Sequence, residues 1–158
     1  MERLLIQNIG LLATPAGHEA RRGPAQGEIS MTKNAWLLAE DGVIAASGTG
    51  APPGCGTAQV LDAQGCLVTP GLVDAHTHLI FGGWRQNELG LKLHGVSYLE
   101  ILARGGGILS TVEATRAASE AALVQKALPE LETMLRWGTT TCEIKSGYGL
   151  ATEQELKQ

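Results

Sequence analysis

The feature that most constrains this sequence is a short segment in which two histidines alternate with apolar residues. The segment follows the turn-forming pair Pro70-Gly71 and spans residues 72–81. Its alternation of apolar and polar residues predicts a β-strand. Because side chains in a strand point to alternate faces, we expect Asp74, His76 and His78 to lie on the same side.

Two imidazoles placed two residues apart on one strand face can bind the same metal ion. Histidine is the commonest protein ligand for zinc, and it also binds iron. A catalytic metal site needs about three protein ligands and an open position for water, so His76 and His78 would supply two of them. The alternative is a pair of hydrogen-bonded core histidines. The preceding Pro-Gly turn and the apolar strand favour the metal site.

The first seventy residues show short strand patterns separated by turns. Three runs read as strands, at residues 4–12, 35–39 and 43–46. The pair Asp41-Gly42 joins the last two as a hairpin, because glycine accepts a positive φ. A second turn, residues 63–65, lies between two further short apolar runs. We therefore expect a small antiparallel β unit over residues 1–69, with too few large apolar residues to form a core alone.

After Pro70 the pattern changes to strand, loop, helices and strand. Capping boxes, in which Ser or Thr precedes Glu by three residues, predict helix starts at Ser97, Ser110 and Thr152. The longest helix is expected over residues 119–137, and a proline should kink or split it at Pro129.

An apolar stripe on that long helix is typical of a face packed on a core, and consists of Val124, Leu128, Leu131 and Leu135 with Ala127 and Met134 beside them. A β-branched run over residues 139–145 predicts the next strand. Strand, helical crossover and strand together predict two parallel strands with a right-handed connection, and so an α/β fold.

Two further side chains lie where the predicted strands end. Arg85 follows His78 by seven residues, and its planar fork suits a carboxylate. Tyr148 follows the strand predicted over residues 139–145. From spacing alone, Arg85 could equally be a surface arginine and Tyr148 an ordinary loop aromatic.

Residues 70–78, with the sequence Pro-Gly-Leu-Val-Asp-Ala-His-Thr-His, resemble the first barrel strand of the amidohydrolase superfamily. Other segments resemble the superfamily members that act in histidine degradation, at residues 81–85, 95–101, 105–108 and 143–150. The resemblance covers residues 61–158 well and the first sixty only loosely. The His-x-His pair is specific to the superfamily, whereas Arg85 and the Lys-Ser-Gly-Tyr-Gly segment point to the histidine-degrading members.

The resemblance implies an α/β fold in which residues 70–158 form the first βα units of an amidohydrolase-type (β/α)8 TIM barrel. Residues 1–69 would form the N-terminal half of a small β-sandwich, and both domains would be incomplete in this chain. The implied activity is metal-dependent hydrolysis of a small-molecule substrate, 4-imidazolone-5-propanoate, to N-formimidoyl-L-glutamate. Family members often dimerise, so a homodimer is one expected assembly.

The resemblance also implies roles for individual residues. His76 and His78 would hold one metal ion, Zn or Fe. Arg85 would bind the propanoate carboxylate, and Tyr148 would contact the ring. Asp74 is expected to support the histidines rather than to bind the metal. Some amidohydrolases bridge two metals with a carboxylated lysine, but the resemblance implies a single metal and gives Lys145 no such role.

In the family, a further His and an Asp complete the metal site, and another His and an acidic residue contact the substrate and transfer the proton. The resemblance places all four beyond Gln158, so no catalytic residue is assigned within this chain. The 158 residues are therefore expected to be an N-terminal fragment that is inactive alone. Two alternatives stay open, namely another amidohydrolase such as a deaminase of nucleobases, and a non-catalytic truncated remnant.

Net charge and composition limit the classes of binding partner and the cellular compartment that we expect. The net charge of −4 gives no reason to expect binding to nucleic acid or to an anionic membrane. No apolar run approaches the roughly 18 residues of a membrane span, and the N-terminus lacks the features of a signal peptide, so a cytoplasmic location is expected. The three cysteines, Cys55, Cys66 and Cys142, are expected to be free thiols, and His18 a solvated loop residue.

Overall fold

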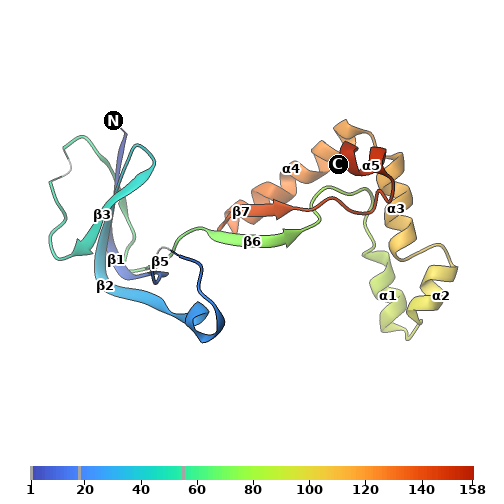
Figure 1. The fold of residues 1–158 in the computed structure, drawn as a ribbon, viewed down its shortest axis with the longest axis horizontal. Coiled ribbons are helices and arrows are strands. Elements are labelled where there is room, and N and C mark those ends of the chain that lie inside the picture. Colours follow the sequence, from blue (N-terminus) through green and yellow to red (C-terminus); the bar gives the residue numbers. More distant parts are fainter. Residues whose placement is uncertain (1, 18, 55) are drawn as a thin grey trace. The chain divides into compact units, whose positions relative to one another are not determined.

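The computed structural model describes residues 2–17, 19–54 and 56–158. The predictions for His18 and Cys55 therefore lie outside the described residues. The chain divides into two compact units, Met1–Pro70 and Gly71–Gln158, and the division falls where the sequence pattern changes. Secondary structure in the chain is mixed, with strands in both units and α-helices in the second (Figure 1).

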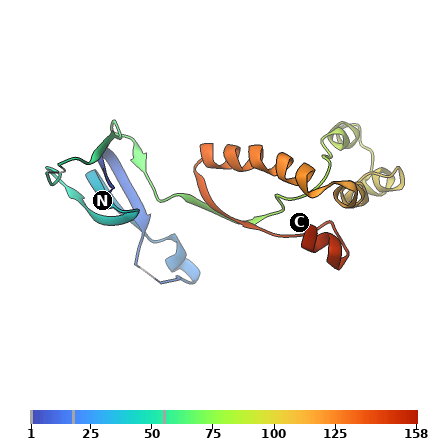
Figure 2. The ribbon, with the colours of Figure 1, turned by 90° about the horizontal axis from the view of Figure 1, so that it is seen from above.

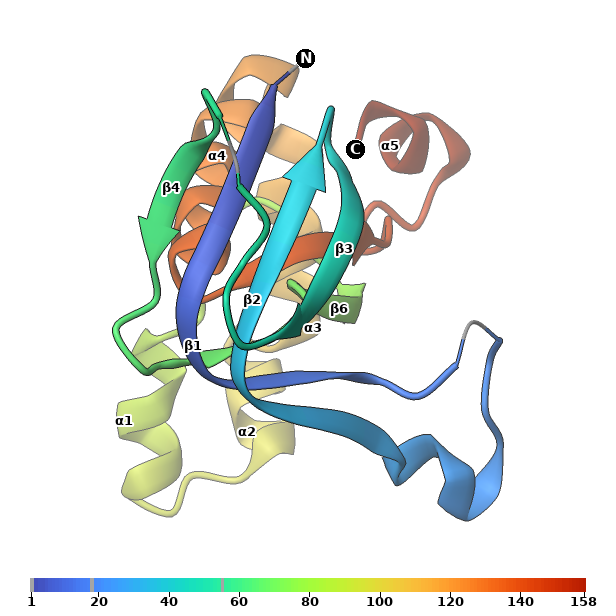
Figure 3. The ribbon, with the colours of Figure 1, turned by 90° about the vertical axis from the view of Figure 1, so that its left-hand side faces the viewer.

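The first unit is a sheet whose described part has five strands (Figure 3). The strands are β1 (Arg3–Pro15), β2 (Ile29–Glu40), β3 (Val43–Thr49), β4 (Gln59–Asp62) and β5 (Leu67–Val68), with a short 3-10 helix, Gly23–Gly27, between β1 and β2. The order is β3-β2-β1-β4, and β5 also pairs with β1. The long central strand β1 therefore organises the unit.

The prediction of an antiparallel unit is right for β1, β2 and β3 and wrong for β4 and β5, which pair with β1 in parallel. The connection over residues 50–58 is long enough to carry the chain back to the start of β1, as parallel pairing requires. The predicted hairpin is present, with positive φ at Asp41 and Gly42. The predicted turn at 63–65 separates β4 from β5. This turn lies so close to β1 that position 10 requires glycine, because a Cβ at Gly10 would lie 2.0 Å from the Gly65 carbonyl oxygen.

A small apolar cluster forms the core of the first unit. Ile9, Leu12, Ala35 and Leu37 are buried in it, and four partly buried side chains pack against them, those of Ile6, Ala39, Ala63 and Val68. Other large apolar side chains of the same sheet remain exposed, including Val43, Ile44, Val60, Leu61 and Leu67. The apolar side chains of the unit are thus divided between a small buried core and an exposed set.

The second unit contains a pair of parallel strands and five helices in its described chain. The strands are β6 (Leu72–Thr77) and β7 (Thr139–Ile144). The helices are α1 (Asn87–Leu93), α2 (Tyr98–Ala103), α3 (Ile108–Ala117), α4 (Glu120–Arg136) and α5 (Thr152–Lys157). Helix α4 runs beside β7 in two perpendicular views (Figures 1 and 2). The predicted parallel strand pair is confirmed.

A helix begins at or near each of the three predicted starts, but only one of the three capping boxes forms. Ser97 caps α2, where its Oγ accepts the backbone N–H of Glu100 at 3.2 Å. Helix α5 begins at Thr152 as predicted and α3 begins at Ile108, two residues before Ser110, and neither has a side-chain cap. A positive φ at Gly107 turns the chain into α3 earlier than the capping pattern suggested.

The long helix α4 differs from its prediction in two respects. It is not split at Pro129, and both Pro129 and Gln125 are exposed, so water can satisfy the Gln125 carbonyl that loses its helical partner. The predicted core stripe is largely exposed at Val124, Leu128 and Leu135. The buried positions of α4 are Ala127, which was expected beside the stripe, and Leu123.

Two further predictions concern the whole chain. Cys66 and Cys142 are free thiols, as predicted. Within the described ranges, every helix is too short or too polar to traverse a lipid bilayer.

Candidate functional site

The two histidines of the His-x-His segment lie at the end of β6. His76 belongs to the strand, whereas His78 follows its last residue, so the prediction of a strand over residues 72–81 is wrong beyond Thr77. The pairing of β6 with β7 is irregular between Asp74 and Thr77. The two imidazole rings nevertheless come together, with centroids 5.3 Å apart.

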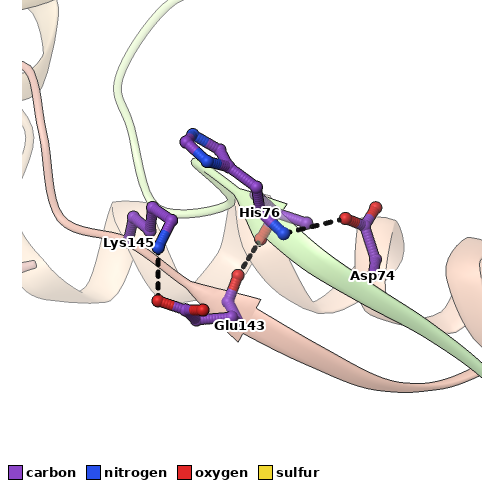
Figure 4. A network of polar contacts seen from close by, with 5 residues as sticks. Asp74, His76, Glu143 and Lys145 are labelled. Carbon is purple, nitrogen blue, oxygen red and sulfur yellow. Dashed lines mark hydrogen bonds and ion pairs between the residues drawn. The ribbon is translucent and has the colours of Figure 1, made fainter. Parts of the chain in front are cut away.

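The polar groups around His76 hold the strand end in place (Figure 4). Asp74 Oδ1 accepts the backbone N–H of His76 at 3.1 Å, so this carboxylate stabilises the backbone of the histidine. Glu143 of β7 forms an ion pair with Lys145, which directly follows that strand. The hydrogen bond and the charge of Lys145 hold the pKa of the Glu143 carboxyl below its usual range. The Lys145 ammonium therefore already has a partner, the Glu143 carboxylate.

The histidine pair has the chemistry of a partial metal site. His78 Nδ1 is buried and has no hydrogen-bond partner among the described residues, and a buried ring nitrogen without a partner suits a metal ligand. No group of three His, Cys, Asp or Glu side chains within the described ranges is placed to hold a metal ion. The residues present thus fit two ligands of a metal site and do not complete it.

A pocket of about 230 Å³ lies beside His78. Six residues line it, namely His78, Phe81, Trp84, Arg85, Thr111 and Tyr148. Three of the four candidate residues from the sequence therefore meet around one cavity, and the fourth, His76, reaches it through its ring contact with His78. A larger pocket of about 370 Å³ in the first unit has no titratable side chain in its lining, which makes it a poor candidate for catalysis.

Tyr148 reaches the pocket from a loop with unusual backbone geometry. Tyr148 and Leu150 both have positive φ values, of 68° and 51°, which non-glycine residues rarely adopt. The Tyr148 ring lies 5.2 Å from the His78 ring between centroids. Gly147 lets the loop approach, because a Cβ at that position would lie 2.8 Å from the His78 ring.

Helices α3 and α5 hold this strained loop. Arg116 Nε donates to the Gly149 carbonyl at 2.7 Å, and the Gly147 N–H donates to Gln158 Oε1 at 2.9 Å. The Leu150 N–H donates to Glu155 Oε1 at 2.8 Å, and this bond contributes most to lowering the pKa of the Glu155 carboxyl. Sequence patterns did not predict these contacts, of which the longest in sequence joins residues 33 positions apart.

Arg85 is placed by a buried carboxylate that sequence reasoning missed. Glu88 is 4% exposed. Its Oε1 accepts the Gly107 N–H at 2.6 Å, and its Oε2 lies 4.0 Å from Arg85 Nη1. Glu88 therefore links the Gly105–Gly107 turn to the cationic end of the pocket. The i,i+3 spacing of Arg85 and Glu88 was the available signal for this pair.

Comparison with known proteins adds independent information. The model of the amidohydrolase family matches residues 59–140, which is more than half of the 158 residues. A protein of Bacillus velezensis named imidazolonepropionase is 50% identical over 155 residues, covering 98% of this chain and 37% of the relative. A protein of the same name from Caldanaerobacter subterraneus subsp. tengcongensis is 49% identical over 154 residues, with the same two coverages. This chain thus spans somewhat over a third of the length of these relatives.

Solved structures give a fold likeness at low sequence identity. A crystal structure described as an amidohydrolase superposes with a TM-score of 0.58 at 20% identity, covering 98% of this chain and 29% of that one. A second crystal structure, of an uncharacterized protein, gives a TM-score of 0.59 at 16% identity, covering 92% of this chain and 26% of that one. These likenesses bear on the fold alone.

Proposed function

This chain belongs to the amidohydrolase family, and from that membership we propose that the protein hydrolyses 4-imidazolone-5-propanoate to N-formimidoyl-L-glutamate, a step of histidine degradation. Relatives that share about half of their aligned residues with this chain and carry the name imidazolonepropionase support the proposal. The observation that carries it is the pocket in which His78, Arg85 and Tyr148 meet.

The proposal includes the finer architecture. Residues 70–158 would be the first βα units of a (β/α)8 barrel, and residues 1–69 the first half of a β-sandwich. Support comes from the parallel pair β6-β7 with its helical crossover and from the mostly antiparallel sheet of the first unit. In a barrel of this kind, functional groups gather at the carboxyl ends of the strands, which is where His78 and Tyr148 lie.

His76 and His78 would hold one ion, Zn or Fe. An ion held there would lower the pKa of a bound water toward neutrality and polarise the carbonyl of the substrate ring. The unpartnered Nδ1 of His78 supports this assignment. Asp74 would keep the backbone of His76 in place through its hydrogen bond.

Arg85 and Tyr148 would bind the substrate. The Arg85 guanidinium can pair with the propanoate carboxylate through two parallel hydrogen bonds. Its neighbour Glu88 is 4.0 Å away and already accepts another donor, so the guanidinium keeps donors free for the substrate. Tyr148, packed beside His78, would orient the ring at the metal. None of the pocket residues is assigned the proton transfer.

The proposal is tested in the full-length protein by mass spectrometry of the product from 4-imidazolone-5-propanoate, together with metal analysis. His78→Ala should remove bound metal and activity together. The matched control His94→Ala changes an exposed histidine of the same unit and should leave both unchanged. Ammonia release from a purine or pyrimidine, without turnover of the imidazolone, would instead indicate a nucleobase deaminase.

A further inference from the structure

The aromatic wall of the pocket is backed by a lysine that lies outside the pocket lining. Phe81 and Trp84 line the pocket with ring centroids 5.2 Å apart in an edge-to-face arrangement. The Nζ atom of Lys126, on α4, lies 3.1 Å from the centroid of the Phe81 ring and 3.9 Å from the Trp84 ring. One ammonium group thus contacts both rings of the wall.

The rings are the principal partners of this ammonium. Lys126 Nζ is buried and makes no hydrogen bond with any described residue. Burial lowers the pKa of Lys126, and the charge of Glu130 opposes that shift. A desolvated cation without hydrogen bonds is costly, and attraction to the faces of two aromatic rings offsets part of that cost. The placement of Lys126 therefore depends on Phe81 and Trp84.

The positions of Phe81 and Trp84 depend in turn on Lys126, because of the sequence between the two rings. Only Gly82 and Gly83 separate them, and neither has a side chain that could fix the segment. One backbone bond anchors it, from the Gly82 N–H to Thr115 Oγ1 at 2.9 Å. Gly83 has a positive φ and leads directly into Trp84, which precedes Arg85. The ring contacts with Lys126 thus add to the Gly82 bond in holding residues 81–84, which lead into Arg85.

We propose that Lys126 is a positioning residue whose ammonium group holds Phe81 and Trp84 in place and thereby fixes the aromatic wall and the neighbouring Arg85. Lys126 is not among the residues that line the pocket. The effect on substrate binding rests on the proposed function, whereas the effect on the wall does not. Lys126→Met removes the charge and keeps an unbranched side chain one atom shorter, and Lys126→Arg keeps a cation.

The wall itself is tested by fluorescence, without any need for activity. In a Trp36→Phe, Trp137→Phe background of this 158-residue chain, Trp84 is the one tryptophan left among its residues. Lys126→Met should shift its emission to longer wavelength and increase its quenching by acrylamide, and Lys126→Arg should restore most of the parent signal. The control Lys92→Met removes the same charge from an exposed site of the same unit and should change nothing. An unchanged Trp84 signal in Lys126→Met would overturn the proposal.

Kinetics of the full-length protein test the consequence for the substrate. Lys126→Met should raise KM about fivefold with kcat within about twofold, because the wall orients the substrate and does not take part in bond breaking. Arginine should restore KM, whereas a loss of stability that arginine does not rescue, with unchanged KM, would reduce Lys126 to a packing role. If the protein does not act on the imidazolone at all, the fluorescence result still decides the proposal.

A measurement on the unsubstituted protein covers the case in which Lys126→Met does not fold. Ring currents should move the ε-CH2 proton resonance of Lys126 upfield of that of Lys92. A resonance at the same position as that of Lys92 would contradict the contact.

Discussion

The two units of this chain differ in what they bury. In the first unit the buried core is a cluster of Ile, Leu and Ala side chains. In the second unit the buried side chains include the polar or charged Glu88, Thr111 and Thr115, and no comparable group is buried in the described part of the first. Buried polar groups are tolerated when they are hydrogen-bonded. Two of these three have side-chain bonds to backbone groups of loops that border the pocket.

The hydrogen bonds of Thr115 and Glu88 show how buried polar side chains hold loops of the second unit. Thr115 Oγ1 donates to the Thr111 carbonyl at 2.7 Å and accepts the Gly82 N–H. Glu88 accepts the Gly107 N–H and lies beside Arg85. The side-chain bonds to turns of the first unit, such as that of Asp41 Oδ1 with the Glu2 N–H, are exposed, whereas the second unit uses buried side-chain bonds to place segments that carry candidate functional side chains.

The largest expected effect comes from a substitution in the apolar core of the first unit. Ile9 is 0% exposed, and Ile9→Ala should lower the free energy of unfolding of the first unit by about 2–5 kcal/mol through lost burial and a residual cavity. The control Ile29→Ala, at a side chain 54% exposed on the same sheet, should cost about 0.5 kcal/mol or less. Urea unfolding of both variants gives the comparison, and equal losses would show that Ile9 is not the centre of this core.

The next effect concerns the pocket alone. Arg85→Ala should lower kcat/KM for 4-imidazolone-5-propanoate by the equivalent of about 2–3 kcal/mol, because a buried charged hydrogen bond to the carboxylate is lost. The free energy of unfolding should change little, since the guanidinium is partly exposed. Steady-state kinetics of the full-length protein measure the effect, with the exposed Arg136→Ala on α4 as the control. Unchanged kinetics would remove Arg85 from the substrate site.

A smaller effect isolates one directional bond of the second unit. Thr115→Val keeps the shape of the side chain and leaves the buried Gly82 N–H without an acceptor, which should cost about 1–3 kcal/mol. Thr133→Val is a matched control, because its exposed hydroxyl also donates to a carbonyl in its own helix, and it should cost about 0.5 kcal/mol or less. Amide exchange at Gly82 should accelerate only in Thr115→Val. Similar behaviour of both variants would mean that this buried bond does not hold the loop.

The same contrast explains which features could be predicted from the sequence. The hairpin at Asp41-Gly42, the cap at Ser97 and the strand at Thr139–Ile144 depend on local residue preferences, and all three are present in the structure. The parallel pairing of β4 with β1 depends on where a long connection returns, which no local pattern specifies. Helix α1 was not predicted, because it has neither a capping box nor a long apolar stripe.

The site shows the same division. The residues that sequence reasoning selected, His78, Arg85 and Tyr148, lie around one pocket because strand ends and their loops bring them together. The residues it missed act through contacts distant in sequence, such as Glu88 with Gly107 and Lys126 with Phe81. Their side chains are of types that are ordinary in sequence, and only the fold gives them a specific partner.

The smallest expected effect concerns the Glu155 carboxylate, which holds the loop of Tyr148. Hydrogen bonds, above all that from the Leu150 N–H, lower the pKa of Glu155 in the folded chain. A carboxyl with a lowered folded pKa contributes stability at pH values above its unfolded pKa, and the contribution disappears as the pH falls through the folded pKa. Glu155→Gln should therefore lower stability at pH 7 by less than about 1 kcal/mol, because the bond is exposed to solvent.

Unfolding free energies of the parent and of Glu155→Gln, measured from pH 7 into the acid range, should converge as the parent carboxyl becomes protonated. Glu153→Gln, on the same helix and exposed, is the control and should show no such convergence. Because Glu155 acts on the backbone beside Tyr148, Glu155→Gln should also speed amide exchange at Leu150 more than at Ile9 in the first unit. A pH-independent difference would mean that the carboxylate charge does not hold the loop, and that the backbone around Tyr148 is fixed by Arg116 and Gln158 instead.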